Sequence, residues 1–544
     1  MEDIKKLLAK VASCKTLAEN TQYPTLELEP NEVRAVAQKL KDAGFDYLIN
    51  LTGVDYGDAL GTVYHISSST DKTALVVLKT KTADRENPVL HTVCDIWQSA
   101  NLYEREVYDF FGIRFINHPD MRRIFLRGDW KGFPFRKDYN EVNETPTTNV
   151  DIDDLETLPS ITLDRDGKIV EKNAKLFGAN EYVVNIGPQH PATHGVLHLR
   201  TSLDGEIVKK IDPNFGYIHR GIEKLAENLT YPQILPYTER LDYLSGSINR
   251  HAFCMCVENA AGIEVPQRAQ YVRVIFDELT RIASHLLGWG CMAMDMGAIT
   301  AFIYGMRDRE KIMDIFEENG GGRLMPAYSI IGGLTKDVTS GFEKTVLDFV
   351  SYMRESIKEY HTLYTHNPIA SDRMHNVGWL TKETAVALGA TGPTGRASGW
   401  SNDVRKIAPY SAYTKVNFKE ILRNTDTCKG DSFDRYIIRL DEVEESLNII
   451  EQLVTNLPGD GFQVKVPAIV KLPEGEYYQR AETARGDFGV YIKSDGNKNP
   501  YRVKFRSPCM TLISALDPLC KGEKIADLIT IGASLDYVIP CADR

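Results

Sequence analysis

The sequence lacks the features that mark several common protein classes. Its formal net charge is -11 over 544 residues, which argues against a dedicated nucleic-acid binder and against a protein held on anionic lipid by charge. The first residues, Met1 to Lys6, are charged and no apolar core follows them, so we expect no secretion signal. The nine cysteines are scattered and odd in number, which favours free thiols in a reducing cytoplasm over a disulfide framework.

Motifs for nucleotides and metals are also missing. There is no glycine-rich dinucleotide or phosphate-binding loop, and the glycines at 320–322 are typical of a turn, so we predict no nucleotide site. Cys254 and Cys256 form a lone C-x-C without a second pair, which is more typical of core thiols than of metal ligands. We therefore predict that this chain binds no metal and no cofactor of its own.

No apolar run makes an obvious membrane span. The nearest candidate, residues 286–306, contains Asp295 and four glycines, and it continues directly from an amphipathic segment. A buried core helix fits this composition better than a transmembrane helix does. We expect a chain that reaches a membrane only through its partners.

The chain has 544 residues, of which 43% are hydrophobic. This content is enough to form the hydrophobic cores of two or three domains. We predict an α+β fold in which residues 1–139 form a small α+β domain. Residues 140–180 are polar, acidic and without period, which predicts a linker. Residues 181–544 begin with strand patterns and become mainly helical from about 232 to 363.

Local composition and periodicity predict individual elements. Val33, Val36 and Leu40 make one apolar stripe, which predicts a helix. Runs of β-branched and aromatic residues between turn residues predict strands. The predicted elements are a helix over 31–43, strands over 62–66 and 73–78, strands over 182–186 and 196–199, and a long helix over 266–288.

The loop at 187–195 places two histidines four residues apart between two predicted strands. Its sequence, Gly-Pro-Gln-His-Pro-Ala-Thr-His-Gly, is rich in turn residues, which predicts a hairpin tip rather than a helix. A tip that carries His190 and His194 can reach into a cavity and deliver protons near neutral pH. The alternative is a turn with two surface histidines.

A second segment, between residues 103 and 139, packs charges and aromatic rings closely together. It includes Glu104, Arg105 and Glu106, followed by Arg122 and Arg123. Arginine and aromatic side chains often anchor interfaces, so we predict a docking surface for a protein partner. The alternative is a solvated basic loop.

The predicted helix over 266–288 carries a row of charges beside its apolar stripe. Arg273, Asp277 and Arg281 stand four residues apart, so they share one face and can pair with one another. Such a row is by default a solvent-facing ladder of salt bridges, and we predict one here.

Two polar residues stand in surroundings that favour a functional role. Asp295 lies among methionines, alanines and a glycine, where a carboxylate must find a partner or take up a proton; the alternative is a helix cap. Tyr243 follows Asp242 in Arg-Leu-Asp-Tyr, and a phenol can donate a proton to a carbonyl that is being reduced. The alternative for Tyr243 is a core position with a satisfied hydroxyl.

Together these motifs resemble two subunits of respiratory complex I. The runs at 104–113 and 118–124 are similar to the C subunit, the thirty-kilodalton type. The run at 187–196 is similar to the D subunit, which itself resembles the large subunit of nickel–iron hydrogenases. Further matches to the D subunit lie at 219–224, 240–243, 266–270 and 489–496. Nearly the whole chain thus resembles a fused C/D subunit of a bacterial NADH-quinone oxidoreductase.

The resemblance implies a role in quinone reduction. Electrons would come from the terminal iron–sulfur cluster of a neighbouring B-type subunit, and the quinone would enter a cavity between the two subunits. By motif position, His194 and Tyr243 would bond the quinone carbonyls, and Asp295 would pair with His194. Three further residues would lie near the cluster: Arg220, His190 and Met325.

The same resemblance implies an assembly and a location. The partners would be the B-, I- and H-type subunits and the membrane arm, in a proton-pumping complex on the cytoplasmic side of the inner membrane. Two alternatives stay open, namely the equivalent subunit of a ferredoxin-fed complex and a non-catalytic scaffold. The presence of His194, Tyr243 and Asp295 favours the catalytic role over the scaffold.

The sequence also departs from the family pattern. Ile330 and Ile331 replace a usual Arg-Pro, Cys541 replaces a usual acidic residue, and Met325 stands where many members have a histidine near the cluster. Because a thioether cannot titrate, we expect a terminal cluster of low potential, which favours menaquinone over ubiquinone.

The nickel–iron chemistry of the hydrogenases is not expected here. Their metal centre needs four cysteines in two C-x-x-C pairs. Asp242 and Ser245 stand in place of the first pair, and only Cys541 is left of the second. One thiolate cannot hold that centre, so we exclude hydrogenase activity.

Overall fold

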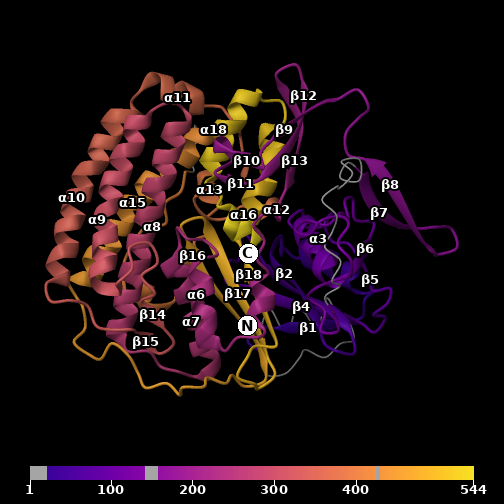
Figure 1. Ribbon diagram of the computed structural model, residues 1–544, viewed down its shortest axis with the longest axis horizontal. Helices are drawn as coiled ribbons and strands as arrows, with labels where there is room; N and C mark the ends of the chain where they lie inside the picture. The colour runs from indigo at the N-terminus through magenta and orange to yellow at the C-terminus, as the bar shows by residue number, and fades with distance from the viewer. Residues whose placement is uncertain (1–20, 141–156, 424–428) are drawn as a thin grey trace.

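The computed structural model describes residues 21–140, 157–423 and 429–544. The predicted α+β class is confirmed: a sheet-rich N-terminal part lies beside a largely helical second part (Figure 1). Within the described ranges, no helix combines the length and the apolarity that crossing a membrane requires.

The N-terminal part is built on a four-stranded sheet in the order β1-β4-β3-β2. β2 and β3 are buried along their whole lengths, and α3 packs against β2. The predicted helix over 31–43 and the strands over 62–66 and 73–78 are confirmed, with longer strands than predicted. The elements are β1 (Thr25–Leu28), α2 (Val33–Asp42), β2 (Tyr47–Asp55), β3 (Leu60–Ser67), β4 (Leu75–Thr82), β5 (Val89–His91), α3 (Ala100–Phe111) and β6 (Arg114–Ile116).

The predicted linker contains a β-hairpin. In its described part, β7 (Thr157–Leu163) pairs antiparallel with β8 (Ile169–Lys175). The hairpin is mostly exposed, but Ile161 is buried and its carbonyl accepts a hydrogen bond from the Asn117 N–H at 2.6 Å. Residues 157–175 of the predicted linker therefore contain regular structure, while residues 141–156 lie outside the described ranges.

The second part begins with a small antiparallel sheet that carries the two-histidine loop. Its strand order is β13-β12-β9, so the loop connects two hydrogen-bonded strands and is the predicted hairpin tip. The elements are β9 (Tyr182–Ile186), β10 (Gln189–His190), the 3₁₀ turn η1 (Pro191–Thr193), β11 (Gly195–Val196), β12 (His198–Asp204) and β13 (Ile207–Asn214).

A bundle of long helices forms the core of the second part (left in Figure 1). The central helix α8 packs against α9 and α15. α8 was predicted to end at 288, but it continues to Asp295. The single helix predicted over 286–306 is in fact two helices, because Gly297, at φ 92°, separates α8 from α9. The elements are α5 (Ile222–Ala226), α6 (Tyr231–Glu239), α7 (Gly246–Ala261), α8 (Gln267–Asp295), α9 (Ile299–Gly320), β14 (Ser329–Ile330), β15 (Gly333–Leu334), α10 (Phe342–Tyr360), the π-helical turn η2 (His361–Thr365) and α11 (Pro368–Met374).

The rest of the chain returns to the N-terminal sheet. A three-stranded antiparallel sheet, β16-β17-β18, lies between the bundle and the N-terminal part (Figure 1). The elements are α12 (Lys382–Leu388), α13 (Gly392–Ala397), α14 (Val404–Ile407), η3 (Ser411–Lys415), α15 (Ser432–Val454), β16 (Gly475–Thr483), β17 (Gly486–Ser494), β18 (Arg502–Arg506), α16 (Pro508–Ser514), α17 (Leu516–Cys520), α18 (Ile525–Leu535) and α19 (Ile539–Asp543).

The prediction of a solvent-facing charge row on α8 is wrong. Arg273, Asp277 and Arg281 are each at most 1% exposed. Arg273 pairs with Glu258 at 2.7 Å, and Asp277 pairs with His251 at 2.6 Å. This face of α8 is polar because it packs against other charged elements, and helical periodicity alone does not distinguish such a face from a solvated one.

Candidate functional site

The hairpin tip holds His194 in an uncommon backbone conformation. His194 follows η1 at φ 51°, in the left-handed region that few residues other than glycine adopt. The Thr193 hydroxyl lies 2.8 Å from the carbonyl oxygens of both His190 and Gly195. His190 accepts a hydrogen bond from the Ala192 N–H through its Nδ1 atom at 3.2 Å. The tip is thus fixed by its own hydrogen bonds, and it holds the His194 ring in one direction.

His194 and Asp295, which the resemblance pairs, lie in contact although 101 residues separate them. The distance from His194 Nε2 to Asp295 Oδ2 is 2.5 Å. The His194 side chain is 21% exposed and the Asp295 side chain 9%, so the imidazole of the pair is partly accessible to solvent. Asp295 is the last residue of α8, and Ala298 precedes α9. Asp295 therefore does not cap a following helix, which was the alternative for this residue.

Tyr243 lies in the short connection between α6 and α7 and is half-buried. Burial raises the pKa of Tyr243, and the nearby Arg485 acts in the opposite direction. Among the described residues its hydroxyl has no hydrogen-bond partner in the chain. Cys291, one turn before Asp295 on α8, is close enough to interact electrostatically with both Tyr243 and Asp295. Cys291 therefore links the position of Tyr243 to that of the His194–Asp295 pair.

The three residues predicted near the cluster lie on three different segments of the chain. His190 and Arg220 are exposed, His190 on the tip and Arg220 just before α5, where its guanidinium donates to the Arg240 carbonyl at 2.8 Å. Met325 is half-buried in the turn after α9. No hydrogen bond or ion pair among the described residues joins any two of the three.

The five residues of the predicted docking surface hold the chain together instead of forming an exposed patch. Glu104, Arg105 and Glu106 are buried. The Arg105 guanidinium donates to the carbonyls of Arg122 and Arg123 at 3.1 and 3.3 Å. The prediction of an exposed surface is therefore wrong, because the segment's charges find their partners inside this chain.

Those partners lie in both parts of the chain. Glu106 binds Lys504, and it binds Arg544 at 2.9 Å. Arg122 binds Asp212 at 2.7 Å, while Arg123 stays within the N-terminal part and binds Asp109 at 2.8 Å. One hydrophobic cluster also runs from the N-terminal sheet to helices α16–α19. The two parts therefore share a core as well as a linker.

Several polar residues near the candidate site were missed from the sequence. Arg485 pairs with Asp242 at 3.3 Å and with Asp536 at 3.1 Å, and all three are buried. Arg309 of α9 is also buried, makes no ion pair among the described residues, and interacts with Tyr243. No local pattern could reveal these groups, because their partners lie far away in the chain.

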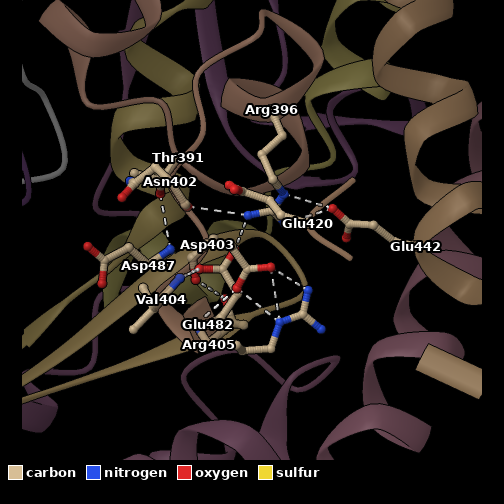
Figure 2. Close-up of polar contacts among 12 residues, drawn as sticks. Thr391, Arg396, Asn402, Asp403, Val404, Arg405, Glu420, Glu442, Glu482 and Asp487 are labelled. Atoms are coloured by element: carbon tan, nitrogen blue, oxygen red, sulfur yellow. Dashed lines mark hydrogen bonds and ion pairs between the residues drawn. The ribbon is translucent and has the colours of Figure 1, made fainter. Parts of the chain in front are cut away.

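Elsewhere in the second part, a network of paired charges joins α8, α13, α15 and β16. Figure 2 shows Arg396 between Glu442, at 2.7 Å, and Glu482, at 2.6 Å. Arg405 binds Asp403 at 2.7 Å and Glu278 at 3.1 Å (Figure 2 shows Arg405 and Asp403). Burial raises the pKa of Glu482 to about 7. Removing one partner from such a buried network leaves an uncompensated charge, so the network fixes how these elements pack.

Comparisons with known proteins agree with this architecture. A family model described as "Respiratory-chain NADH dehydrogenase, 30 Kd subunit" matches residues 26–145. A second one, described as "Respiratory-chain NADH dehydrogenase, 49 Kd subunit", matches residues 295–544. The class of protein is therefore a subunit of the respiratory NADH dehydrogenase in which two usually distinct modules occur in one chain.

Individual relatives define the family more closely. The C/D subunits of NADH-quinone oxidoreductase from Phocaeicola vulgatus and Bacteroides thetaiotaomicron are 53% and 52% identical, and each match covers 92% of this chain and 95% of the relative. The D-type NADH-quinone oxidoreductase subunit of Desulforamulus reducens is 46% identical over 66% of this chain and 97% of its own length. The chain belongs to the family of fused C/D subunits of NADH-quinone oxidoreductase.

Proposed function

We propose that this chain forms one wall of a quinone-reduction cavity in a proton-pumping NADH-quinone oxidoreductase. The observation that supports this most is the His194–Asp295 pair, whose imidazole is partly accessible to solvent. Tyr243 supports it further, because its hydroxyl is unpartnered within the described chain and it lies near the same cysteine as Asp295. The site thus offers an imidazole and a phenol to a substrate that must gain two protons.

His194 delivers the first proton in this proposal. Conversion of a quinone to a quinol takes up two electrons and two protons. Because Nε2 of His194 faces Asp295, its Nδ1 is the nitrogen left to face a quinone carbonyl. The Asp295 carboxylate orients the ring and stabilises the positively charged imidazolium, which donates its proton from Nδ1.

Tyr243 delivers the second proton. A phenol is protonated at neutral pH, as a donor must be, and burial raises the pKa of Tyr243, which makes loss of its proton more costly. Loss of the proton leaves a phenolate, and two cationic groups, Arg485 and Arg309, interact with that phenolate favourably. Their charges lower the cost of the transfer without contact to the quinone.

The electrons are supplied by the terminal iron–sulfur cluster of a neighbouring B-type subunit. Arg220 and His190 are exposed and available to face that subunit. Met325 takes the place of a titratable side chain near the cluster, so the cluster potential should be low and nearly independent of pH. A low-potential donor suits menaquinone better than ubiquinone.

The remaining partners in this proposal are the I- and H-type subunits and the membrane arm. The chain would then sit peripherally on the cytoplasmic side of the inner membrane and touch the bilayer only through those subunits. Purified membranes that retain the chain with B-type and membrane-arm subunits would support this placement. Recovery of the chain free of them would contradict it.

Replacement of the Tyr243 hydroxyl tests the proposal. Tyr243→Phe removes one proton donor and little volume, so quinone reduction by the assembled complex should fall by on the order of 10²-fold. Reduction of the iron–sulfur clusters by NADH should persist, because the change lies after the clusters. Tyr237→Phe, the same change six residues earlier on α6, is the matched control and should keep normal rates. Equal rates in both variants would contradict the assignment of Tyr243.

The Met325 hypothesis has its own test. Redox titration of the terminal cluster, followed by electron paramagnetic resonance at several pH values, measures how its midpoint potential depends on pH. We expect a weak dependence near neutrality. A slope near 60 mV per pH unit, the one-proton value that follows from the tenfold relation, would contradict it.

A further inference from the structure

Two buried thiols and a carboxylate meet next to the candidate quinone site. They belong to Cys509 of α16, Cys541 of α19 and Asp242, the residue before Tyr243. The two Sγ atoms and a carboxylate oxygen all lie within 4.8 Å of one another. Each residue is at most 1% exposed. Cys541 is the departure from the family pattern that the quinone chemistry leaves unexplained, and Cys509 is its nearest thiol.

Both sulfur atoms are already held by hydrogen bonds. The Val538 N–H donates to Cys509 Sγ at 3.3 Å. The Ser507 hydroxyl lies 2.9 Å from Cys541 Sγ. Hydrogen bonds that orient the side chains binding a metal are a regular part of metal sites.

Arg485 supports the carboxylate without occupying it fully. Its guanidinium lies 3.3 Å from Asp242, but it is anchored elsewhere, by Ser284 at 3.0 Å and by the Asp536 carbonyl at 2.7 Å. Arg485 contacts both Asp242 oxygens, at 3.3 and 3.5 Å, and Oδ1 also accepts from the Leu244 N–H at 3.1 Å. Among the described residues, Oδ2 accepts only from Arg485, so it keeps lone-pair capacity for an ion. The positive charge beside the site also favours anionic ligands.

In contrast to the expectation from the sequence that this chain binds no metal, we propose that Asp242, Cys509 and Cys541 hold one soft divalent metal ion of the zinc class. Zinc binds sulfur at about 2.3 Å and carboxylate oxygen at about 2.0–2.2 Å. A tetrahedron with these bonds has ligand-to-ligand edges of about 3.6–3.8 Å, which the observed grouping within 4.8 Å can supply. The Ser507 hydroxyl caps α16 by accepting from the Cys509 N–H at 3.1 Å, so a solvent molecule is the fourth ligand in this proposal.

The charges balance when the ion enters. Two thiols lose their protons as two metal–sulfur bonds form, so one divalent ion replaces two protons and the buried net charge does not change. Thiolate ligands select soft ions over magnesium or calcium. Two thiolates and one carboxylate differ from the four-thiolate set of nickel–iron enzymes, so the site is structural and implies no hydrogenase activity.

A second group of metal-ligand residues, Cys94, Glu104 and His118, does not fit an ion equally well. His118 Nδ1 accepts a hydrogen bond from the Asp120 N–H at 2.9 Å. The proton of the neutral ring is therefore on Nε2, the atom that faces Glu104 at 3.8 Å. A protonated nitrogen cannot coordinate a metal, so this group is a hydrogen-bonded cluster.

Metal binding by the purified full chain tests the proposal. The reduced chain is freed of metal and titrated with Zn²⁺, and with Co²⁺ because thiolate-bound cobalt absorbs strongly in the near ultraviolet. We expect one tightly bound equivalent and a thiolate–cobalt band. Cys509→Ser should weaken binding at least tenfold and reduce the band. Cys520→Ser, which changes another fully buried thiol outside the group, is the matched control and should change neither.

A second variant keeps the test decisive if serine is not tolerated. Cys541→Glu restores the acidic residue usual in the family, so it should fold, as circular dichroism can verify, and lose about half of the thiolate–cobalt band. The proposal is overturned if the wild-type chain binds no stoichiometric ion, or if Cys509→Ser and Cys541→Glu bind as the control does. It is also overturned if alkylation shows a Cys509–Cys541 disulfide in place of two thiols.

Discussion

The loop-tip site and the charge network of the second part use the same residue types for opposite purposes. At the tip, the His194 ring bonds Asp295 through Nε2, and among the described residues its Nδ1 has no hydrogen-bond partner. In the network, Arg396 is 0% exposed and both of its carboxylate partners are buried with it. Charges with every partner inside the chain stabilise packing, whereas partly exposed polar groups with spare capacity can carry chemistry.

This difference makes location and hydrogen-bond saturation more informative than residue type. The charge row on α8 and the Glu104–Glu106 segment both contain residues common in active sites. Both are buried, and most of their charges pair with other groups of this chain, as Arg273 does with Glu258 and Glu106 with Arg544. Tyr243, in contrast, combines partial burial with an unpartnered hydroxyl among the described residues.

The largest expected effect comes from breaking the network. Arg396→Met leaves Glu442 and Glu482 buried without their shared cation, which should cost about 3–5 kcal/mol of unfolding free energy. Urea unfolding of the full chain measures it. Arg354→Met is the matched control, because Arg354 pairs with Glu444 and Glu451 at the surface and should cost about 0–1 kcal/mol. Similar losses of unfolding free energy in both variants would contradict the distinction between buried and surface ion pairs.

Glu104 differs from the carboxylates of the network, because it is buried without an arginine or lysine partner among the described residues. Burial raises its pKa to about 8, so the folded chain keeps a proton that the unfolded chain releases above about pH 4.5. The free energy of unfolding should therefore fall as the pH rises from about 4.5 to about 8. His118, whose pKa burial lowers to about 4, has the opposite effect, but only below about pH 6.5.

The variant Glu104→Gln isolates this effect, because glutamine does not titrate. Between pH 6.5 and 8 the wild-type chain should lose on the order of 1 kcal/mol per pH unit relative to the variant. Urea unfolding at both pH values measures the difference. Glu359→Gln, a change of an exposed carboxylate, should leave the pH dependence unaltered. A parallel pH dependence of wild type and Glu104→Gln would show that Glu104 is ionised in the fold.

The smallest effect is expected from cutting the chain between residues 141 and 156. The ion pairs of Glu106 with Arg544 and of Arg122 with Asp212, together with the shared core, should keep the two pieces associated. Co-purification of the pieces, and a complex of normal activity, are the expected results. Separation of the pieces would mean that the linker contributes more than the interface does.

Local patterns in the sequence were sufficient for several elements. The stripe of Val33, Val36 and Leu40 predicted α2, and the turn residues at 187–195 predicted the hairpin tip. Period and composition describe one element at a time, so they did not show that the polar face of α8 is buried. They also did not reveal the β7–β8 hairpin, whose strands are mostly solvated and carry little apolar alternation.

The candidate site was less predictable from local sequence patterns than the helices and strands were. His194, Tyr243 and Asp295 were selected through the family resemblance, because the contact between His194 and Asp295 spans 101 residues and leaves no local signal. Arg485, Arg309 and Cys509 were missed for the same reason. Their importance comes only from what the fold places beside them.

Photolabelling with a quinone tests the central claim most directly. A quinone analogue with a photoreactive group on its ring is irradiated in the assembled complex, and the labelled peptides of this chain are identified by mass spectrometry. The label should appear on the peptides that contain His194 and Tyr243, and excess natural quinone should suppress it. Suppressible labelling confined to other peptides, with none on these two, would contradict the quinone site proposed here.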